Sequence, residues 1–202
     1  MALLAERFQC IRTYSMTGLE VIPALARKHG LKVMLGAWVN ANPVDTDKEV
    51  DALIASANAN PDVVTAVIVG NEALLRKEVT GERLAALIAR VKSQVKVPVT
   101  YADVWEFWLQ HPQVAPAVDF LTIHLLPYWE DDPRGIDDAL AHVATYAGCS
   151  ASASPPRTSS SAKPAGPAKA ANARLPCRAG PTRHGSSAVS WPWPRPMAGA
   201  TT

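Results

Sequence analysis

The residue best placed to do chemistry is Glu72, which follows an apolar run at residues 63–69 directly through Gly70 and Asn71. A carboxyl group just beyond a buried strand, partly shielded from water, can hold a proton and give it to a leaving group. The alternative is an ordinary glutamate at the start of a helix, where the helix dipole stabilises its charge. Residue type alone leaves both interpretations open.

Aromatic and hydrogen-bonding residues follow the other apolar runs. Aromatic faces stack on the apolar faces of sugar rings, while amides, carboxylates and imidazoles bond sugar hydroxyls. The set therefore suits a carbohydrate, and Asn71 can bond the hydroxyl beside the reacting carbon as an oxocarbenium-like transition state develops. The alternative is that the tryptophans only pack beneath loops. The set comprises Tyr14, Ser15, Trp38, Asn40, Tyr101, Asp103 and residues 124–130.

Short apolar runs alternate with amphipathic stretches, a pattern typical of a parallel α/β fold. The carboxyl ends of parallel strands meet at one edge of a sheet, so the candidate residues are expected to lie together there. The pattern fits a barrel or a doubly wound sheet and does not choose between them. The predicted strands are residues 10–14, 31–39, 63–70, 97–102 and 118–124.

Helices are predicted between these strands. One is expected to begin at Thr46, with Glu49 three residues later as in a capping box. Another places Leu84, Leu87, Ile88 and Val91 on one face.

Charge divides the chain of 202 residues into a body and a tail. The tail, residues 147–202, holds seven of the 20 basic residues and no Asp or Glu, which leaves 13 basic against 18 acidic residues in the body. The tail is also rich in Pro, Ala and Ser, a composition typical of disorder. The basic residues of the tail are Arg157, Lys163, Lys169, Arg174, Arg178, Arg183 and Arg195.

Several classes of protein are not indicated. No apolar run is long enough to span a bilayer, and the N-terminus lacks the features of a secretory signal. Cys10, Cys149 and Cys177 have neither metal-ligand spacing nor the density of a disulfide framework. We expect no metal, no cofactor and no nucleic-acid partner.

Five segments, in this order and spacing, resemble bacterial members of glycoside hydrolase family 17. The resemblance covers about residues 3–145 and implies a (β/α)8 barrel of which strands two to six are present. It also implies retaining cleavage of β-1,3-glucan and a periplasmic, secreted or cell-envelope location. The segments are IRTYS (11–15), GLKVMLG (30–36), VIVGNE (67–72), PVTYAD (98–103) and VDFLTIH (118–124) followed by PYW (127–129).

The resemblance also implies roles for individual residues. Glu72 becomes the general acid/base at the end of the fourth barrel strand, and Asn71 its sugar-binding neighbour. The candidate sugar contacts are Tyr14, Tyr101, His124, Tyr128 and Trp129.

The family's nucleophile, expected after a seventh strand, has no counterpart here. No Asp or Glu follows residue 146, and we expect Glu78, Glu106, Glu130, Asp131 and Asp132 to be solvated loop charges. In a frame displaced by one nucleotide, residues 161–168 permit Gly-Glu-Thr-Gly-Trp-Pro-Ser, which resembles the nucleophile segment. Residues 197–202 permit Gly-Trp-Arg-Tyr-Asn, which resembles the start of the last strand. We infer a frameshift near residues 145–148; the alternative is a genuine disordered linker.

Three functions remain open from the sequence. The first is a retaining β-1,3-glucan hydrolase, inactive as written because its nucleophile is missing. The second is a transglycosylase of the same fold. The third is a non-catalytic carbohydrate-binding protein whose basic tail attaches to an acidic surface.

Overall fold

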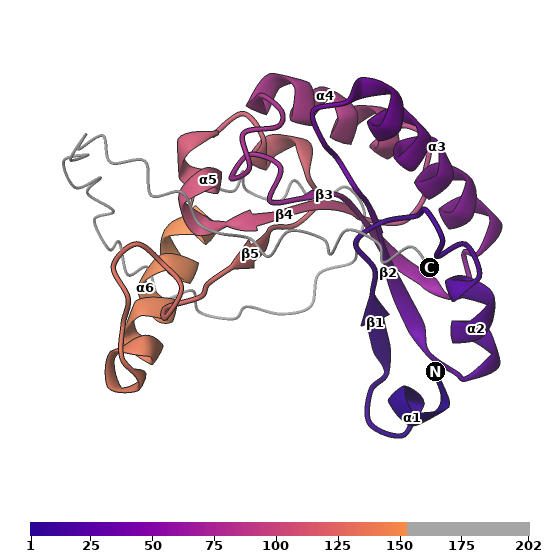
Figure 1. Ribbon diagram of the computed structural model, residues 1–202, viewed down its shortest axis with the longest axis horizontal. Helices are drawn as coiled ribbons and strands as arrows, with labels where there is room; N and C mark the ends of the chain where they lie inside the picture. Colours follow the sequence, from indigo (N-terminus) through magenta and orange to yellow (C-terminus); the bar gives the residue numbers. More distant parts are fainter. Residues whose placement is uncertain (153–202) are drawn as a thin grey trace, which may run out of the picture. The chain divides into compact units, whose positions relative to one another are not determined.

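Five parallel strands form one curled sheet in the computed structural model, which describes residues 1–152 of the chain (Figure 1). Each strand pairs with the next one along the chain, so the sheet has the order of consecutive barrel strands. The predicted α/β fold, a partial barrel, is confirmed. The strands are β1 (Cys10–Arg12), β2 (Lys32–Ala37), β3 (Val64–Asn71), β4 (Val99–Val104) and β5 (Thr122–His124).

Helices alternate with the strands, and α2, α3 and α4 lie along one face of the sheet (Figure 1). None of the helices among residues 1–152 has the length and apolar character needed to cross a bilayer. The helices are α1 (Ala2–Ala5), α2 (Ile22–Lys28), α3 (Pro43–Ala59), α4 (Gly81–Lys92), α5 (Trp105–Gln110) and α6 (Ile136–Ser152), with a 3-10 turn η1 (Ala115–Ala117).

The prediction that a helix begins at Thr46 is wrong. Helix α3 begins at Pro43, because Asn42 caps it by accepting a hydrogen bond from the Val44 amide at 3.0 Å, and proline is favoured in a first turn. Thr46 is buried inside the helix, where its hydroxyl bonds the backbone of Asn40. Glu49 is buried too, so it closes no capping box.

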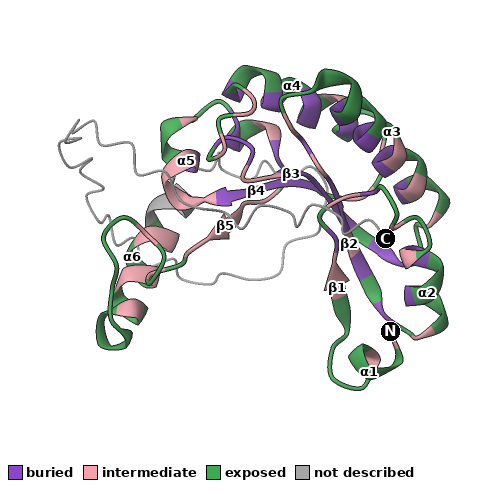
Figure 2. Ribbon diagram, viewed as in Figure 1, coloured by how far each residue is buried: buried purple, intermediate pink, exposed green. Residues whose placement is uncertain are grey.

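The core lies between the sheet and helices α3 and α4, whose inner faces are buried (Figure 2). Leu84, Leu87, Ile88 and Val91 of α4 are buried, as predicted from their helical spacing. They pack in one cluster with residues of α3 and of the strands, including Leu53. This cluster fixes the sheet from which the candidate site projects.

Strand β5 is shorter than predicted and begins at Thr122. Asp119 explains the difference, because its carboxylate accepts a hydrogen bond from the Val99 amide at 2.8 Å and holds the chain in a bend before pairing with β4 starts. Helix α6 continues through Ser152, beyond the predicted boundary at residue 146. The remainder of the predicted tail, residues 153–202, lies outside the described residues, as do its predicted disorder and displaced-frame segments.

Candidate active site

Glu72 stands at the carboxyl end of β3 with its backbone in the left-handed region, at φ 53°. Gly70, two residues earlier, has φ 91°. The Glu72 amide donates to the Ala102 carbonyl of β4 at 2.7 Å, which fixes this turn against the next strand. A left-handed conformation costs a non-glycine residue about 1–3 kcal/mol, and such strain is concentrated at functional sites. The backbone at Glu72 therefore adopts an unfavourable conformation that fixes the direction of its side chain.

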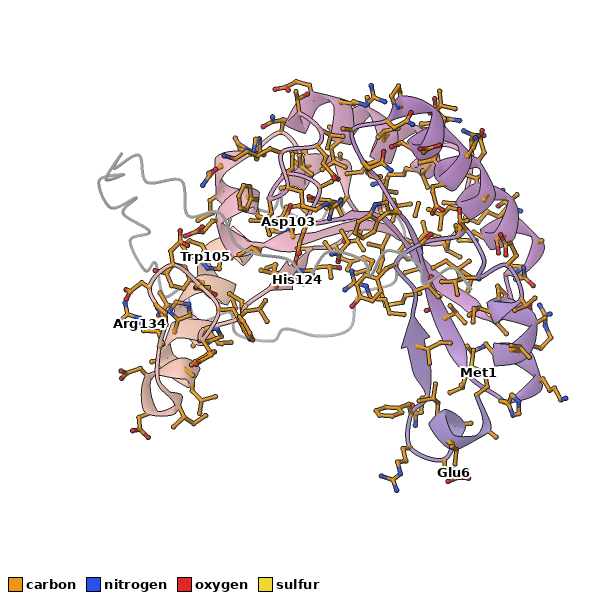
Figure 3. All side chains as sticks on the ribbon, viewed as in Figure 1. Met1, Glu6, Asp103, Trp105, His124 and Arg134 are labelled. Carbon is orange, nitrogen blue, oxygen red and sulfur yellow. The ribbon has the colours of Figure 1, made fainter. Side chains whose placement is uncertain are left out.

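His124 meets Glu72 across the intervening strand β4. Its Nδ1 lies 2.6 Å from Glu72 Oε1, and both side chains are partly shielded from solvent. His124 ends β5, which is separated from β3 by β4, and Figure 3 shows it near Asp103 and Trp105. The sequence predicted the two residues separately, and the structure brings them into direct contact.

Arg12 holds the side chain of Asn71. Its Nη2 donates to Asn71 Oδ1 at 2.7 Å, and its guanidinium lies over the Tyr14 ring, 4.5 Å from the centroid. Its Nε is buried without a hydrogen-bond partner in the described part of the chain. Burial lowers the pKa of Arg12, while Tyr14 and Glu72 act to raise it. No role was predicted for Arg12, although a cation within a predicted strand was a usable signal.

A second arginine, Arg76, holds the backbone of Asn71. It donates to the carbonyl of Asn71 and, at 2.9 Å, to that of Val39. Its guanidinium lies over the Trp38 ring, 4.2 Å from the centroid, and it pairs with Glu78 at 2.7 Å. Asn71 is thus held by two arginines, each of which also covers one face of an aromatic ring. Glu78 belongs to this network, contrary to its prediction as a solvated charge.

Tyr101 is fully buried in this structure. Its hydroxyl bonds Asp103 and accepts the Leu74 amide at 3.0 Å, which places it beneath the loop that follows Glu72. Burial raises the pKa of Tyr101, and Asp103 raises it further. Burial likewise raises the pKa of Asp103. In this structure Tyr101 supports the loop after Glu72, and its role as a sugar contact stays a prediction.

The loop between β5 and α6 presents Tyr128 and Trp129, both exposed, with their rings edge to face at 5.7 Å. The prediction that Glu130 is a solvated charge is wrong, because only 9% of its side chain is exposed. Its carboxylate bonds His142 at 2.6 Å, the Trp105 indole at 3.1 Å and the Leu126 amide at 3.1 Å. Burial raises the pKa of the neighbouring Glu106, and Asp131 and Glu130 add to the shift.

The profile of the BtgE/BtgC glycoside hydrolase domain matches residues 1–158. The chain belongs to this glycoside hydrolase family. Among its relatives are two curated proteins named glucan 1,3-beta-glucosidase. The one from Arthroderma benhamiae is 29% identical over 147 residues, which are 66% of this chain and 47% of the relative. The one from Schizosaccharomyces pombe is 32% identical over 144 residues, 63% of this chain and 44% of the relative. The chain therefore spans less than half the length of either protein.

A solved structure supports the family and the fold together. The glycoside hydrolase family 17 β-1,3-glucanosyltransferase from Rhizomucor miehei is 29% identical, with a TM-score of 0.66, over 75% of this chain and 58% of that one. An active-site mutant of the same enzyme was solved in complex with laminaritriose. The resemblance to family 17 is confirmed. These relatives are fungal, and the bacterial source stays a prediction.

At the end of β3, the described residues supply one carboxylate for catalysis, that of Glu72. Retaining cleavage uses two carboxyl groups about 5–5.5 Å apart. The neighbouring acids Asp103, Glu130 and Glu78 are already bonded to other protein groups. Within residues 1–152, no group of three or more His, Cys, Asp or Glu side chains is arranged to hold a metal ion. The arrangement is suited to proton transfer by Glu72.

Proposed function

We propose that this chain forms the acid/base side of a glycoside hydrolase site for β-1,3-glucan. Glu72 would protonate the departing glycosidic oxygen and later take a proton from water. The observation that carries the proposal is the contact of Glu72 with His124 at 2.6 Å, on the strand edge where Asn71 is also fixed. The family and its glucan-processing relatives support the substrate class.

The hydrogen bond from Arg12 supports a role for the Asn71 amide as a donor to the sugar. A guanidinium has donors only, so the atom that it bonds at 2.7 Å must be the carbonyl oxygen of Asn71. The Asn71 NH₂ group is therefore left to donate, and a sugar hydroxyl oxygen can accept from it. Tyr14, Tyr128 and Trp129 are exposed aromatic side chains that can stack on sugar rings, as proposed from the sequence.

We further propose that the chain as written does not complete the covalent step. No Asp or Glu follows residue 146, so the tail supplies no nucleophile. The Nε of Arg12, which is buried and unpartnered among the described residues, supports the idea that a second carboxylate would be stabilised beside Arg12. A guanidinium readily pairs with a carboxylate through several N–H donors. A reading-frame shift near residues 145–148 would account for the missing carboxylate.

The test is to offer laminarin and laminaritriose to this chain. We expect no release of reducing ends above background, together with saturable binding of laminaritriose in an NMR titration. Asn71→Ala should weaken that binding, because the fixed amide donor is lost. Turnover that disappears in Glu72→Gln would contradict the proposed inactivity and reveal a second carboxylate. Absence of any glucan binding by the folded chain would contradict the proposed site.

A second candidate is transfer of the glycosyl unit to another sugar, because the Rhizomucor miehei relative is a glucanosyltransferase. A chain with its reading frame restored distinguishes the two by its products. Longer oligosaccharides would support transfer, and shorter ones alone would support hydrolysis. Binding without any change in glucan length would favour the non-catalytic alternative.

A further inference from the structure

Glu49 of α3 is a buried carboxylate that no described cation pairs with, and only 6% of the residue is exposed. Its oxygens instead accept hydrogen bonds from two separate loops, the one after β1 and the one after β2. The donors are Ser15 Oγ at 2.9 Å, the Met16 amide at 2.7 Å, the Thr17 amide at 2.9 Å, the Thr17 hydroxyl, and the Trp38 amide at 3.0 Å.

The two loops carry the aromatic residues on the β1 side of the site. Tyr14 directly precedes the first group of donors, and Trp38 is itself a donor. Each ring then lies against an arginine that bonds Asn71: Arg12 beside Tyr14 and Arg76 beside Trp38. Glu49 therefore holds the backbone of both loops, and the ring that each loop carries lies against an arginine bonded to Asn71.

We propose that Glu49 is a positioning residue for the glucan site, whose carboxylate fixes the loops that hold Tyr14 and Trp38 as one sugar-binding wall. This inference rests on the proposed function. Carboxylate is the group required, because it only accepts hydrogen bonds and all of its partners here are donors. A glutamine in its place would turn an NH₂ group toward one set of donors.

The test compares Glu49→Gln with Asp119→Asn. Asp119 is the control, because its carboxylate also accepts a backbone amide, that of Val99 at 2.8 Å, but it pairs with Lys92 at 2.6 Å and lies outside the proposed wall. Two measurements are made on each folded variant: the laminaritriose dissociation constant by NMR titration, and the ¹⁹F spectrum of protein carrying 5-fluorotryptophan. The Trp38 resonance is assigned by its loss in Trp38→Phe.

For Glu49→Gln we expect the dissociation constant to rise about tenfold, the equivalent of one charge-assisted hydrogen bond, and the Trp38 resonance to shift or broaden. Asp119→Asn should change neither measurement, even if it lowers stability. Unchanged binding and an unchanged Trp38 resonance in Glu49→Gln would overturn the proposal. Equal effects in both variants would also overturn it, since Glu49 would then act only on stability.

A second variant tests the same idea from the donor side and guards against misfolding of Glu49→Gln. The double variant Ser15→Ala, Thr17→Val removes only hydroxyl donors from the first loop. We expect weaker laminaritriose binding with the Trp38 resonance in place, because the Trp38 amide still bonds Glu49; unchanged binding would count against the proposal. If the unaltered folded chain does not bind laminaritriose, the proposed function fails, while the Trp38 resonance of Glu49→Gln still tests whether Glu49 orders that loop.

Discussion

Two regions of this chain are built very differently. Residues 10–118, which carry β1 to β4, enclose a core in which Leu53, Val67 and Ile88 are fully buried. In residues 122–148, which carry β5 and most of α6, no residue is buried as a whole, although the side chains of Glu130 and His142 are shielded (Figure 2). Ile136 and Leu140 of α6 are 85% and 81% exposed. The first region therefore fixes the geometry of the site by its own packing, while the second leaves apolar side chains exposed to solvent.

The candidate site draws on both regions. Glu72, Asn71 and the two arginines belong to the packed region, whereas His124 and the exposed rings of Tyr128 and Trp129 belong to the open one. The Glu72–His124 contact therefore joins a rigid part of the sheet to a less buried one. Both β1 and β5 are edge strands of the described sheet. Their unpaired backbone N–H and C=O groups can pair with a strand of another chain.

The largest contrast between the regions should appear in core substitutions. Leu53→Ala is expected to lower the free energy of unfolding by about 2–5 kcal/mol, because it leaves a cavity in the packed core. Leu140→Ala, at an exposed position, should change it by less than about 0.5 kcal/mol. Urea unfolding followed by circular dichroism measures both. Equal losses would mean that α6 is packed as tightly as α3.

A smaller effect is expected on the local stability of the open region, residues 122–148, which should change independently of the packed region. His142→Ala removes a hydrogen-bond partner from the shielded Glu130 carboxylate and should cost about 1–3 kcal/mol locally. Hydrogen–deuterium exchange is expected to accelerate in residues 125–142 and to stay unchanged in α3. Faster exchange throughout α3 would show that the two regions open as one unit, which would contradict their separate stability.

The smallest effect should be a pH dependence in the packed region. Burial acts to raise the pKa of Glu49, but the hydrogen bonds from Thr17, Trp38 and Met16 outweigh it and leave this pKa lowered. A lowered folded-state pKa gives stability that is present above the unfolded value of about 4.3 and is lost as the pH falls through the folded value.

The stability of the unaltered chain relative to Glu49→Gln should therefore shrink as the pH falls from about 6 toward about 3. Urea unfolding at a series of pH values measures this difference, with Asp119→Asn as the control. A difference that grows on acidification would contradict the direction of the Glu49 shift.

The sequence predicted the helices, the strands and the position of Glu72 after a strand more readily than the contacts between residues far apart in the chain. The strands followed from the apolar runs, and the positions of Glu72 and His124 from their places after such runs, because these signals are local. The strand order of a barrel and the roles of the two residues came from the resemblance to family 17. The roles of Arg12, Arg76 and Glu49 depend on partners far away in the chain, which no local pattern contains. The start of α3 was missed because Asn42 and Pro43 outweigh Thr46 as helix-start signals. The burial of Glu130 depends on α6, beyond the reach of loop composition.

The central claim is that Glu72 is the general acid/base of a β-1,3-glucan site. It is tested most directly in a chimeric barrel in which residues 1–146 replace the corresponding part of the Rhizomucor miehei glucanosyltransferase, which then supplies the remaining strands. In the folded chimera, Glu72→Gln should lower kcat/KM on laminari-oligosaccharides by about a thousandfold. The loss should be much smaller on an aryl glucoside, whose leaving group needs little protonation. Full activity on laminari-oligosaccharides without Glu72, or products of inverted anomeric configuration, would contradict the assignment.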